Sequence, residues 1–285
     1  MEDHKFRLNI VVVGLGLIGS SFAMALRKLS PKNIWGIDKD KNTIDTALNK
    51  KIIDGGFTHE SNILKKADLT IIALYPECTV EFVRKNIKNF KRGSIIIDTC
   101  GIKVPVIEKI SSFLPHELEF IGTHPMAGRE KSGIESASEC IFNGANYIIT
   151  PTSKNKKSSL EFIRDMAKGI GFKNVVYTSP EKHDDMISIT SQMPHILAAS
   201  LIDSSLNESD IDLFIGGSFK DVTRIAVINS ALWSELFTVN SDKLIDKIEK
   251  FQQSLEKIKQ AIKVNDKKML YDIFEKVTAK RKEIF

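Results

Sequence analysis

The sequence predicts an α/β fold, a doubly wound parallel sheet of the Rossmann type, followed by an all-α C-terminal domain. Short β-branched runs alternate with amphipathic segments as far as about residue 178, and such alternation with short connections is typical of parallel sheets with right-handed crossovers. After Thr178 the pattern stays helical to Phe285. We therefore expect a sheet domain at residues 1–178 and a helical domain at residues 179–285.

Composition narrows the class of protein. A chain of 285 residues, with 42% hydrophobic and 27% charged residues, is typical of a soluble globular protein with two domains. The net charge of +5 is spread over the chain without a basic run, so we expect no nucleic-acid partner. Short apolar runs and the absence of a signal-peptide pattern predict no membrane partner and a cytoplasmic location. The three cysteines have no metal-ligand spacing, so we expect reduced thiols and no metal.

The expected elements of the sheet domain follow from local pattern. Strands are predicted at 8–13, 34–37, 69–74, 94–97 and 119–122, and helices at 20–29, 43–49, 80–87 and 104–113. Strands at 145–150 and 174–178, around a helix at 159–170, would extend the sheet. In the helical domain an apolar stripe with heptad spacing predicts either a buried helix face or an interface between subunits; its members are Leu244, Ile248, Phe251, Leu255, Ile258 and Ile262.

A glycine-rich turn predicts dinucleotide binding. The turn follows the first strand, opens the next helix, and reads Gly14-Leu15-Gly16-Leu17-Ile18-Gly19. Its first two glycines allow a tight turn and close approach of backbone N–H groups to a pyrophosphate, and the third allows close helix packing. Asp38 ends the second strand, where a carboxylate can accept hydrogen bonds from a ribose diol and would repel a 2′-phosphate. This favours NAD over NADP, although Lys39 and Lys41 could soften the preference.

The carboxyl ends of later strands complete the expected site, because doubly wound sheets bind ligands at that edge. Leu74, Tyr75, Pro76 and Thr99 are predicted to contact the cofactor. His124, in the sequence Gly122-Thr123-His124-Pro125-Met126-Ala127-Gly128, directly follows a predicted strand. An imidazole titrates near neutral pH and can act as a general base, and the alternative is a histidine that only caps the strand. A base beside a hydride-accepting cofactor indicates a dehydrogenase.

The helical domain offers further polar candidates. Pro194 is expected to kink a helix on which Ile187, Ser191 and His195 share one face. His195 could equally be a satisfied core histidine, and His183 could equally be exposed. Arg224 is suited to bind a carboxylate through two parallel hydrogen bonds, or to pair with Asp221 on the same helix face, or both.

Longer motifs give a family resemblance. The chain resembles the prephenate dehydrogenases, close kin of the arogenate dehydrogenases, in GLGLIGSSFA, THPMAGREKSG at 123–133, FNGANYIITP at 142–151, HDDMISITSQMPHILAASL at 183–201 and GGSFKDVTRIA at 216–226. The resemblance implies oxidative decarboxylation of prephenate by NAD to 4-hydroxyphenylpyruvate, CO2 and NADH, a step of tyrosine biosynthesis. It also implies a homodimer formed by the helical domain. Some relatives carry an additional C-terminal regulatory domain for which this sequence has no room, so we expect any feedback by tyrosine to act at the active site.

The same resemblance assigns roles. His124 resembles the histidine that takes the proton of the ring hydroxyl, and Arg224 the arginine that holds a substrate carboxylate. The other substrate-binding residues implied are His195, Gln192, Glu130, Asp221 and a glycine contributed by the partner subunit, Gly217. Two positions depart from the family pattern: Gly101 stands where many members have serine, and Gln192 where some have a second pocket histidine. A hydroxyl contact is then absent, or is supplied by Thr99 or Cys100.

Three alternatives remain from the residues. One is an arogenate dehydrogenase. Another is a different NAD(P) enzyme, such as a β-hydroxyacid dehydrogenase or an imine reductase, although these usually place a lysine or another donor on the helical half. The third is a nucleotide-sensing regulatory protein, which would bind the cofactor without turnover; His124, His195 and Arg224 argue against it.

Overall fold

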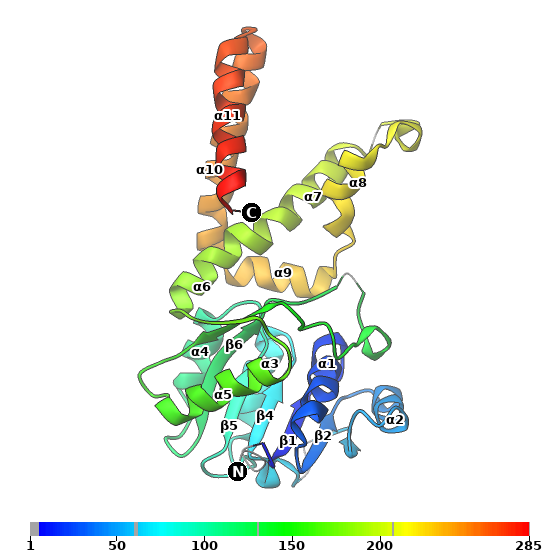
Figure 1. The fold of residues 1–285 in the computed structure, drawn as a ribbon, viewed down its shortest axis with the longest axis vertical. Helices are drawn as coiled ribbons and strands as arrows, with labels where there is room; N and C mark the ends of the chain where they lie inside the picture. Colours follow the sequence, from blue (N-terminus) through cyan, green and yellow to red (C-terminus); the bar gives the residue numbers. More distant parts are fainter. Residues whose placement is uncertain (1–5, 60–61, 130, 207, 285) are drawn as a thin grey trace.

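The protein has a sheet-containing part and a helical part that projects from one edge of the sheet (Figure 1). The computed structural model describes residues 6–59, 62–129, 131–206 and 208–284. In this part of the chain every strand ends by Tyr177, and the elements from Pro180 onward are helical. The predicted α/β class with an all-α C-terminal region is confirmed.

A single sheet of eight strands forms the centre of the first part, in the order β3-β2-β1-β4-β5-β6-β7-β8. The strands from β3 to β6 run parallel. Their bounds are β1 Asn9–Val13, β2 Asn33–Ile37, β3 Gly55–Phe57, β4 Leu69–Ile72, β5 Ile95–Asp98 and β6 Glu119–Pro125. The strand order reverses direction between β1 and β4, and a ligand crevice forms at such a point in doubly wound sheets.

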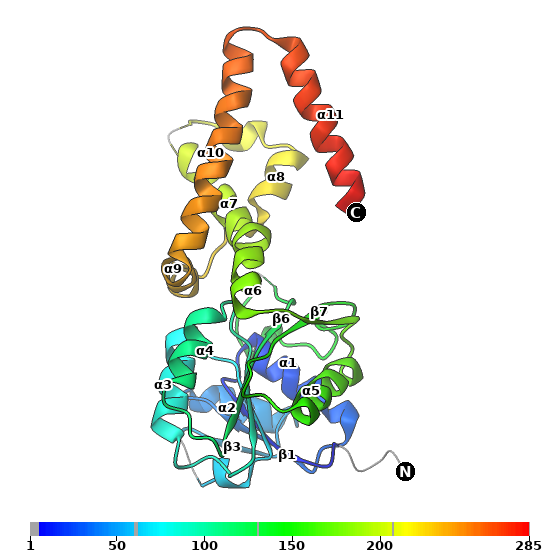
Figure 2. The ribbon, with the colours of Figure 1, turned by 90° about the vertical axis from the view of Figure 1, so that its left-hand side faces the viewer.

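Helices cover both faces of the sheet, as Figure 2 shows with the sheet seen nearly edge-on. One core packs β-strand residues against α1 (Leu17–Leu26), α2 (Lys41–Asn49) and α5 (Lys157–Gly169). The other core packs them against α3 (Pro76–Asn86) and α4 (Val104–Ser111). Asp40 caps α2 by accepting a hydrogen bond from the backbone N–H of Asn42 at 3.0 Å, as its place before the helix predicts.

The far edge of the sheet corrects one prediction. β7 (Asn146–Thr150) pairs with β6 in the antiparallel sense, and β8 (Asn174–Tyr177) runs parallel to β7, so the sheet is mixed. The long connection from β6 reverses the chain, which no local residue pattern reports. Pairing with β7 also extends β6 through His124, which lies opposite Ile148 rather than beyond the strand end. The short β3 escaped prediction because two of its three residues are glycine.

The glycine-rich turn that joins β1 to α1 is closely packed at its first and third glycines. Gly14 has a φ of +85°, and a Cβ there would lie 2.5 Å from the carbonyl oxygen of Ala73. A Cβ on Gly19 would lie 1.8 Å from the oxygen of Gly14, whereas one on Gly16 would meet nothing within 4 Å. Gly14 and Gly19 therefore serve packing, and Gly16 leaves open space at the start of α1.

The helical part begins with α6 (Pro180–Ile187), and the Ser179 side chain caps it by accepting a hydrogen bond from the backbone N–H of Lys182. A π turn at Ser188–Gln192 separates α6 from α7 (Met193–Ser204), and Pro194 lies in the first turn of α7, so the helix is irregular next to the residue at which a kink is expected. The remaining helices are α8 (Gly217–Thr223), α9 (Ser230–Val239), α10 (Ser241–Lys263) and α11 (Lys267–Ile284). The last two form a hairpin that extends away from the sheet (Figures 1 and 2). None of the described helices combines the length and apolar character that crossing a bilayer requires.

Gly19→Ala should destabilise the fold, because its methyl group overlaps backbone that cannot move independently. We expect the free energy of unfolding to fall by about 3 kcal/mol or more, which a fall in the midpoint of thermal unfolding would show. Gly16→Ala is the matched control: it should cost less than about 1 kcal/mol, as an N-cap change, but weaken dinucleotide binding. Equal thermal stability of the two variants would contradict the packing role of Gly19.

Candidate active site

A cavity of about 660 Å³ lies between the carboxyl edge of the sheet and the helical part. This volume is within the range of ligand sites. The sheet part contributes Gly16–Gly19, residues 73–76 and 99–101, and the segment from His124 to Arg129. The helical part contributes Ile187, Ser191, Gln192, His195, Trp233 and Leu236, among others. The cavity therefore combines the predicted cofactor-binding turn, the predicted base and the helix face predicted around Pro194.

The residues of the turn fit a dinucleotide. The start of α1 has no acidic residue in its first turn, so its positive dipole end is available to an anion. Gly16, where a Cβ would meet nothing, lets a pyrophosphate approach the backbone. Most of the predicted cofactor residues line the cavity: Gly16, Leu17, Ile18, Gly19, Leu74, Tyr75, Pro76 and Thr99. Gly14 instead shapes the turn, and the side chain of Leu15 lies in the core.

Asp38 lies at the end of β2, half-buried, outside the residues that line the cavity. Its Oδ2 accepts a hydrogen bond from the backbone N–H of Leu15 at 2.7 Å, and its Oδ1 accepts one from Asp40 at 2.9 Å. The carboxylate therefore ties the glycine-rich turn to β2. Each carboxylate oxygen can accept a second hydrogen bond, which leaves capacity for a ribose hydroxyl.

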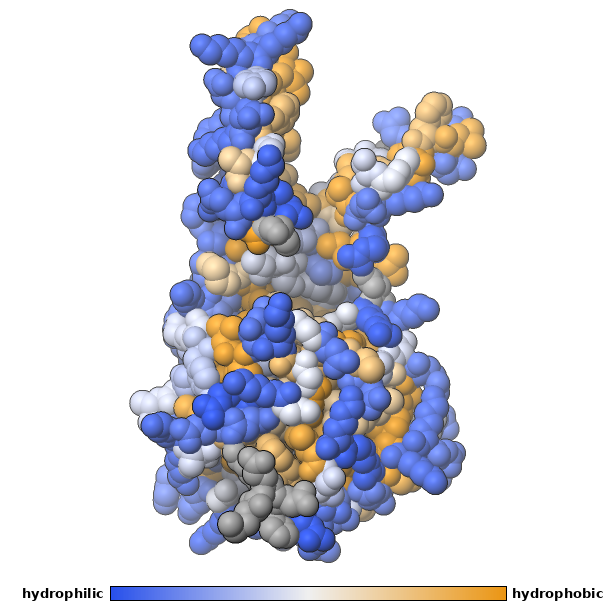
Figure 3. Space-filling model, viewed as in Figure 1, coloured by the Kyte–Doolittle hydropathy of each residue, from blue (hydrophilic) through white to orange (hydrophobic). Residues whose placement is uncertain are grey.

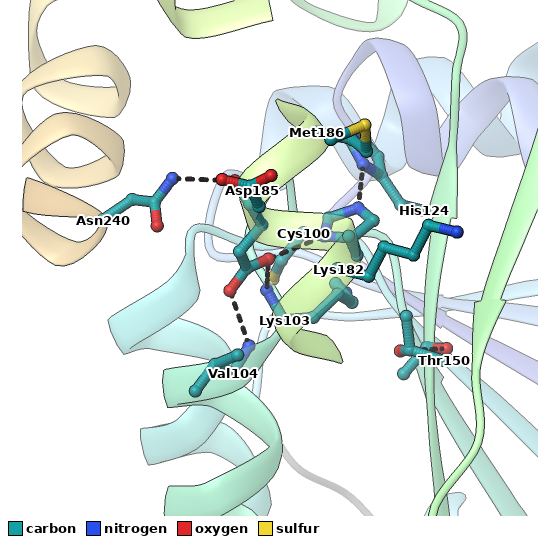
Figure 4. Close-up of polar contacts among 12 residues, drawn as sticks. Cys100, Lys103, Val104, His124, Thr150, Lys182, Asp185, Met186 and Asn240 are labelled. Atoms are coloured by element: carbon teal, nitrogen blue, oxygen red, sulfur yellow. Dashed lines mark hydrogen bonds and ion pairs between the residues drawn. The ribbon is translucent and has the colours of Figure 1, made fainter. Parts of the chain in front are cut away.

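His124 contacts a second histidine. Its Nδ1 lies 2.9 Å from Nε2 of His183 on α6, and the two rings meet edge to face at 65°. Sequence reasoning left His183 open between exposure and burial; it is buried, with only 1% of its surface exposed. The contact joins the sheet part to the helical part at the predicted base (Figure 4).

Asp184, next to His183, fixes α6 onto α4. The Nδ1 of His183 lies 2.6 Å from Oδ1 of the buried Asp184. The backbone N–H groups of Lys103 and Val104, at the start of α4, donate to the two oxygens of Asp184, each at 2.8 Å. One carboxylate thus caps a helix of the sheet part and holds a histidine of the helical part. In the sequence, the pair His183-Asp184 belongs to the family motif at 183–201, but no local pattern indicates that Asp184 caps α4.

A buried ion pair lies beneath this contact. The Nζ of Lys103 bonds to Oδ2 of Asp98, and both side chains are fully buried. The same Nζ donates to the carbonyl oxygen of Thr123 at 2.7 Å, and Asp98 accepts from the backbone N–H groups of Thr123 and Cys100, each at 3.0 Å. The ion pair therefore fixes the ends of β5 and β6, and with them the backbone that carries His124. No local pattern marks Lys103 as buried.

Burial keeps the imidazoles neutral. Desolvation holds the pKa of His124 well below its usual value, and the neighbouring His183 and Lys103 lower it further, since a second proton beside either of them is disfavoured. Desolvation also lowers the pKa of His183, although the hydrogen bond to Asp184 opposes it. His124 is therefore uncharged at neutral pH, in the form that can accept a proton.

The other predicted pocket histidine has a defined orientation. The ring of His195 stacks on Trp233 with centroids 3.6 Å apart, and its Nδ1 lies 2.9 Å from the carbonyl oxygen of Ser191. Because a carbonyl only accepts, Nδ1 carries the proton, and Nε2 of a neutral His195 can accept a hydrogen bond. Gln192 is buried and bonds to Leu236 and Asn240, so it braces α7 against α9 and α10 while it lines the cavity.

At Gly101, where many family members have serine, the structure leaves room for a side chain. A Cβ there would lie 3.6 Å from Leu236 and 4.0 Å from Cε1 of His124, both ordinary contacts. Cys100 does not substitute for the hydroxyl, because its Sγ faces Thr79 and the carbonyl oxygen of Leu74.

Both halves of the chain match models of one family. Residues 22–176 match "Prephenate dehydrogenase, nucleotide-binding domain", and residues 179–276 match "Prephenate dehydrogenase, dimerization domain". The chain belongs to the prephenate dehydrogenase family. It is accordingly a dehydrogenase, and the expectations of a different NAD(P) enzyme or a regulatory protein fall away.

Known relatives are similar to this chain in sequence and in structure over most of its length. A prephenate dehydrogenase of Bacillus subtilis is 34% identical over 278 residues, which cover 95% of this chain and 75% of the relative. A structure of Aquifex aeolicus prephenate dehydrogenase, in complex with hydroxyphenyl propionate and NAD+, has a TM-score of 0.91 at 30% identity and covers 98% of both chains. Synechocystis arogenate dehydrogenase has a TM-score of 0.83 at 25% identity, with 98% of this chain and 100% of that one covered.

The remaining family residues lie apart from the cavity of a single chain. Gly217 and Asp221 lie on α8 and Arg224 directly after it; all three are exposed and none lines the cavity. The nearby Ile225 and Val227 do line it. Glu130 lies outside the described residues. Within the described ranges there is no cluster of histidine, cysteine or acidic side chains that could hold a metal ion.

Lys103→Met should destabilise the protein strongly, because it leaves Asp98 charged and buried without its partner. We expect a loss of about 3–5 kcal/mol in the free energy of unfolding, measured by chemical denaturation. Adding Asp98→Asn should restore part of it, since the amide oxygen still accepts a backbone hydrogen bond. Lys280→Met, which removes an exposed ion pair with Glu283, is the control and should cost no more than about 1 kcal/mol. Equal losses from the two lysine changes would contradict the role of the buried pair.

Proposed function

We propose that this chain oxidises and decarboxylates prephenate with NAD, giving 4-hydroxyphenylpyruvate, CO2 and NADH. One observation carries the proposal: the neutral His124 lines a cavity shared by the dinucleotide turn and the helical part. The Aquifex aeolicus relative, which holds NAD+ and hydroxyphenyl propionate, supports both the cofactor and an aromatic, carboxylate-bearing ligand.

The cofactor is NAD. When bound, it supplies the hydride acceptor. The protein's own task is to bring the substrate carbon and hydroxyl into register and to remove one proton. His124 accepts the proton of the ring hydroxyl, and loss of CO2 leaves an aromatic ring, which provides a large driving force.

The charge of the cavity favours an anionic substrate. Arg129 and Lys131, both exposed, line the cavity. Prephenate and arogenate both carry two carboxylates, but arogenate has an ammonium group where prephenate has a neutral keto group, so positive charge along the cavity favours prephenate. We therefore propose prephenate as the preferred substrate, with arogenate as the alternative that the Synechocystis relative keeps open. His195 and Gln192 would contact the substrate, and Arg224, with Asp221 and Glu130 around it, would hold a carboxylate.

We also propose a homodimer formed by the helical part, with residues 1–178 as the dinucleotide-binding domain and residues 179–285 as the substrate and dimerisation domain. Beyond the buried Leu244, much of the predicted apolar stripe is exposed: Phe251 by 38%, Leu255 by 53% and Ile262 by 59%. Figure 3 shows apolar surface along this projecting hairpin. In the dimer, Gly217 of the partner subunit would approach the cavity. Three free cysteines support a cytoplasmic location.

His124→Asn should lower kcat by about 10²- to 10⁴-fold, because asparagine cannot take the proton, with a modest effect on KM. NADH formation, followed by absorbance with prephenate or arogenate and with NAD or NADP, measures both the loss and the substrate preference. His116→Asn, at a side chain that is 93% exposed, is the control. Turnover near wild type in His124→Asn would remove His124 as the base, and a higher kcat/KM for arogenate would reverse the substrate assignment.

The pH profile tests the neutral base. Because the pKa of His124 lies below its usual value, the base form persists on the acid side of about pH 6.5. We expect kcat/KM for prephenate to stay level through neutral pH and to fall only at lower pH, as His124 becomes protonated. An acid limb centred above pH 7 would contradict a depressed pKa.

Leu255→Lys should disrupt the dimer, because it places a charge in the proposed apolar interface. Sedimentation should show the wild-type chain at twice the chain mass and the variant shifted toward a monomer. Gln253→Lys adds the same charge on the opposite face of α10 and should leave the dimer intact. A wild-type monomer, or equal behaviour of both variants, would place the interface elsewhere.

A further inference from the structure

We propose that His183 is a positioning residue: held by Asp184, it fixes the tautomer of His124 so that the Nε2 of His124 stays unprotonated toward the cavity. The inference deepens the proposed function, since it rests on His124 acting as the base. It is carried by the juxtaposition of three side chains, one on β6 and two on α6, in a continuous line of hydrogen bonds.

The direction of each hydrogen bond follows from what the end group can do. The oxygens of the Asp184 carboxylate already accept from the backbone N–H groups of Lys103 and Val104, and a carboxylate can only accept. The proton in the 2.6 Å contact must therefore lie on Nδ1 of His183. A neutral imidazole with its proton on Nδ1 has an acceptor at Nε2. His124 must then donate from its own Nδ1 across the 2.9 Å contact, which leaves its Nε2 without a proton.

The surrounding charges agree with this assignment. Asp184 faces His183 from α6, while Lys103 and Asp98, from the start of α4 and the end of β5, form their own buried ion pair. Of the neighbours along α6, Lys182 is exposed and Asp185 pairs with Lys247 on α10 at 2.6 Å. The net local charge is therefore negative by one carboxylate, which stabilises a proton held between the two rings but does not compete for Nε2 of His124.

The free edge of the His124 ring faces the cavity. Gly101 lines the cavity, and a Cβ there would lie 4.0 Å from Cε1 of His124, the atom between the two ring nitrogens. Among the hydrogen bonds of the described residues, the His124 ring makes one, to His183. Since Gly101 offers no hydroxyl, the orientation of the ring comes from behind, through His183.

This arrangement serves proton transfer in two ways. It presents the lone pair of the His124 Nε2 without a rotation or a tautomer change. When His124 becomes an imidazolium, its Nδ1–H still donates to His183, which is itself hydrogen-bonded to the Asp184 carboxylate. The same logic of base and orienting group operates in hydrolase triads, where the wrong tautomer greatly slows the reaction. Here the orienting residue comes from the other half of the chain.

The tautomer can be measured directly in the full-length enzyme with NAD bound and no substrate. Histidine labelled with ¹⁵N reports which ring nitrogen carries the proton, and loss of signals in His124→Asn assigns them. We expect the wild type to show Nδ1 of His124 protonated and Nε2 bare. In His183→Leu, which offers no acceptor, we expect a substantial population protonated at Nε2.

Kinetics should follow the tautomer. His183→Leu should lower kcat for prephenate by about 10²-fold with little change in KM, whereas His183→Gln, whose amide oxygen can accept from Nδ1 of His124, should recover most of the rate. Lys182→Leu makes the same change one residue earlier, on the exposed face of α6, and should alter neither tautomer nor kcat. Thermal unfolding of each variant separates loss of fold from loss of rate.

The outcomes distinguish this inference from the proposed function. A wild-type His124 that carries its proton on Nε2 overturns the inference even when no His183 variant folds. An unchanged tautomer and kcat in His183→Leu also overturns it, and leaves His124 as the base. Full turnover in His124→Asn overturns the proposed function instead, whatever the tautomer proves to be.

Discussion

The buried carboxylate of Asp184 connects the two halves of the molecule at one point. A buried carboxylate is costly unless donors surround it, and here the donors are two backbone N–H groups at the start of α4 and the ring of His183. The interaction with α4 is possible only when α6 lies against the sheet part. Capping of a helix, docking of the helical part and orientation of the His124 ring thus depend on the same side chain.

The cavity combines a neutral base with positively charged side chains. Burial, with a smaller contribution from the charge of Lys103, keeps His124 neutral. Elsewhere along the cavity, Arg129 and Lys131 provide exposed positive charge. Exposed positive charge attracts a dianion, while the buried Lys103 contributes to the low pKa of His124. One cavity therefore combines positive charge for an anionic substrate with a neutral base.

The predictable part of this protein is the part encoded in short segments. The glycine spacing from Gly14 to Gly19 and the irregular helix next to Pro194 each depend on a few adjacent residues, and short sequence patterns report them. The cap that Asp40 forms on α2 is equally local. The burial of His183 depends on contacts with distant residues such as His124, 59 positions earlier in the sequence. The direction of β7 likewise depends on pairing with β6, in which Thr150 lies opposite Gly122, 28 positions earlier. Such contacts leave no periodic signal, so a sequence reading could place His124 at the site but not show what orients it.

Gly101 gives the orientation of His124 its particular form in this chain. A side chain at that position would fit, since its Cβ would make only ordinary contacts with Leu236 and His124, so crowding does not explain the glycine. Without a hydroxyl on the cavity side, no described group there competes for Nε2 of His124. The ring is instead held at Nδ1 by His183, a residue of α6. Orientation of the base and formation of the cavity therefore depend on the same packing of the helical part against the sheet edge.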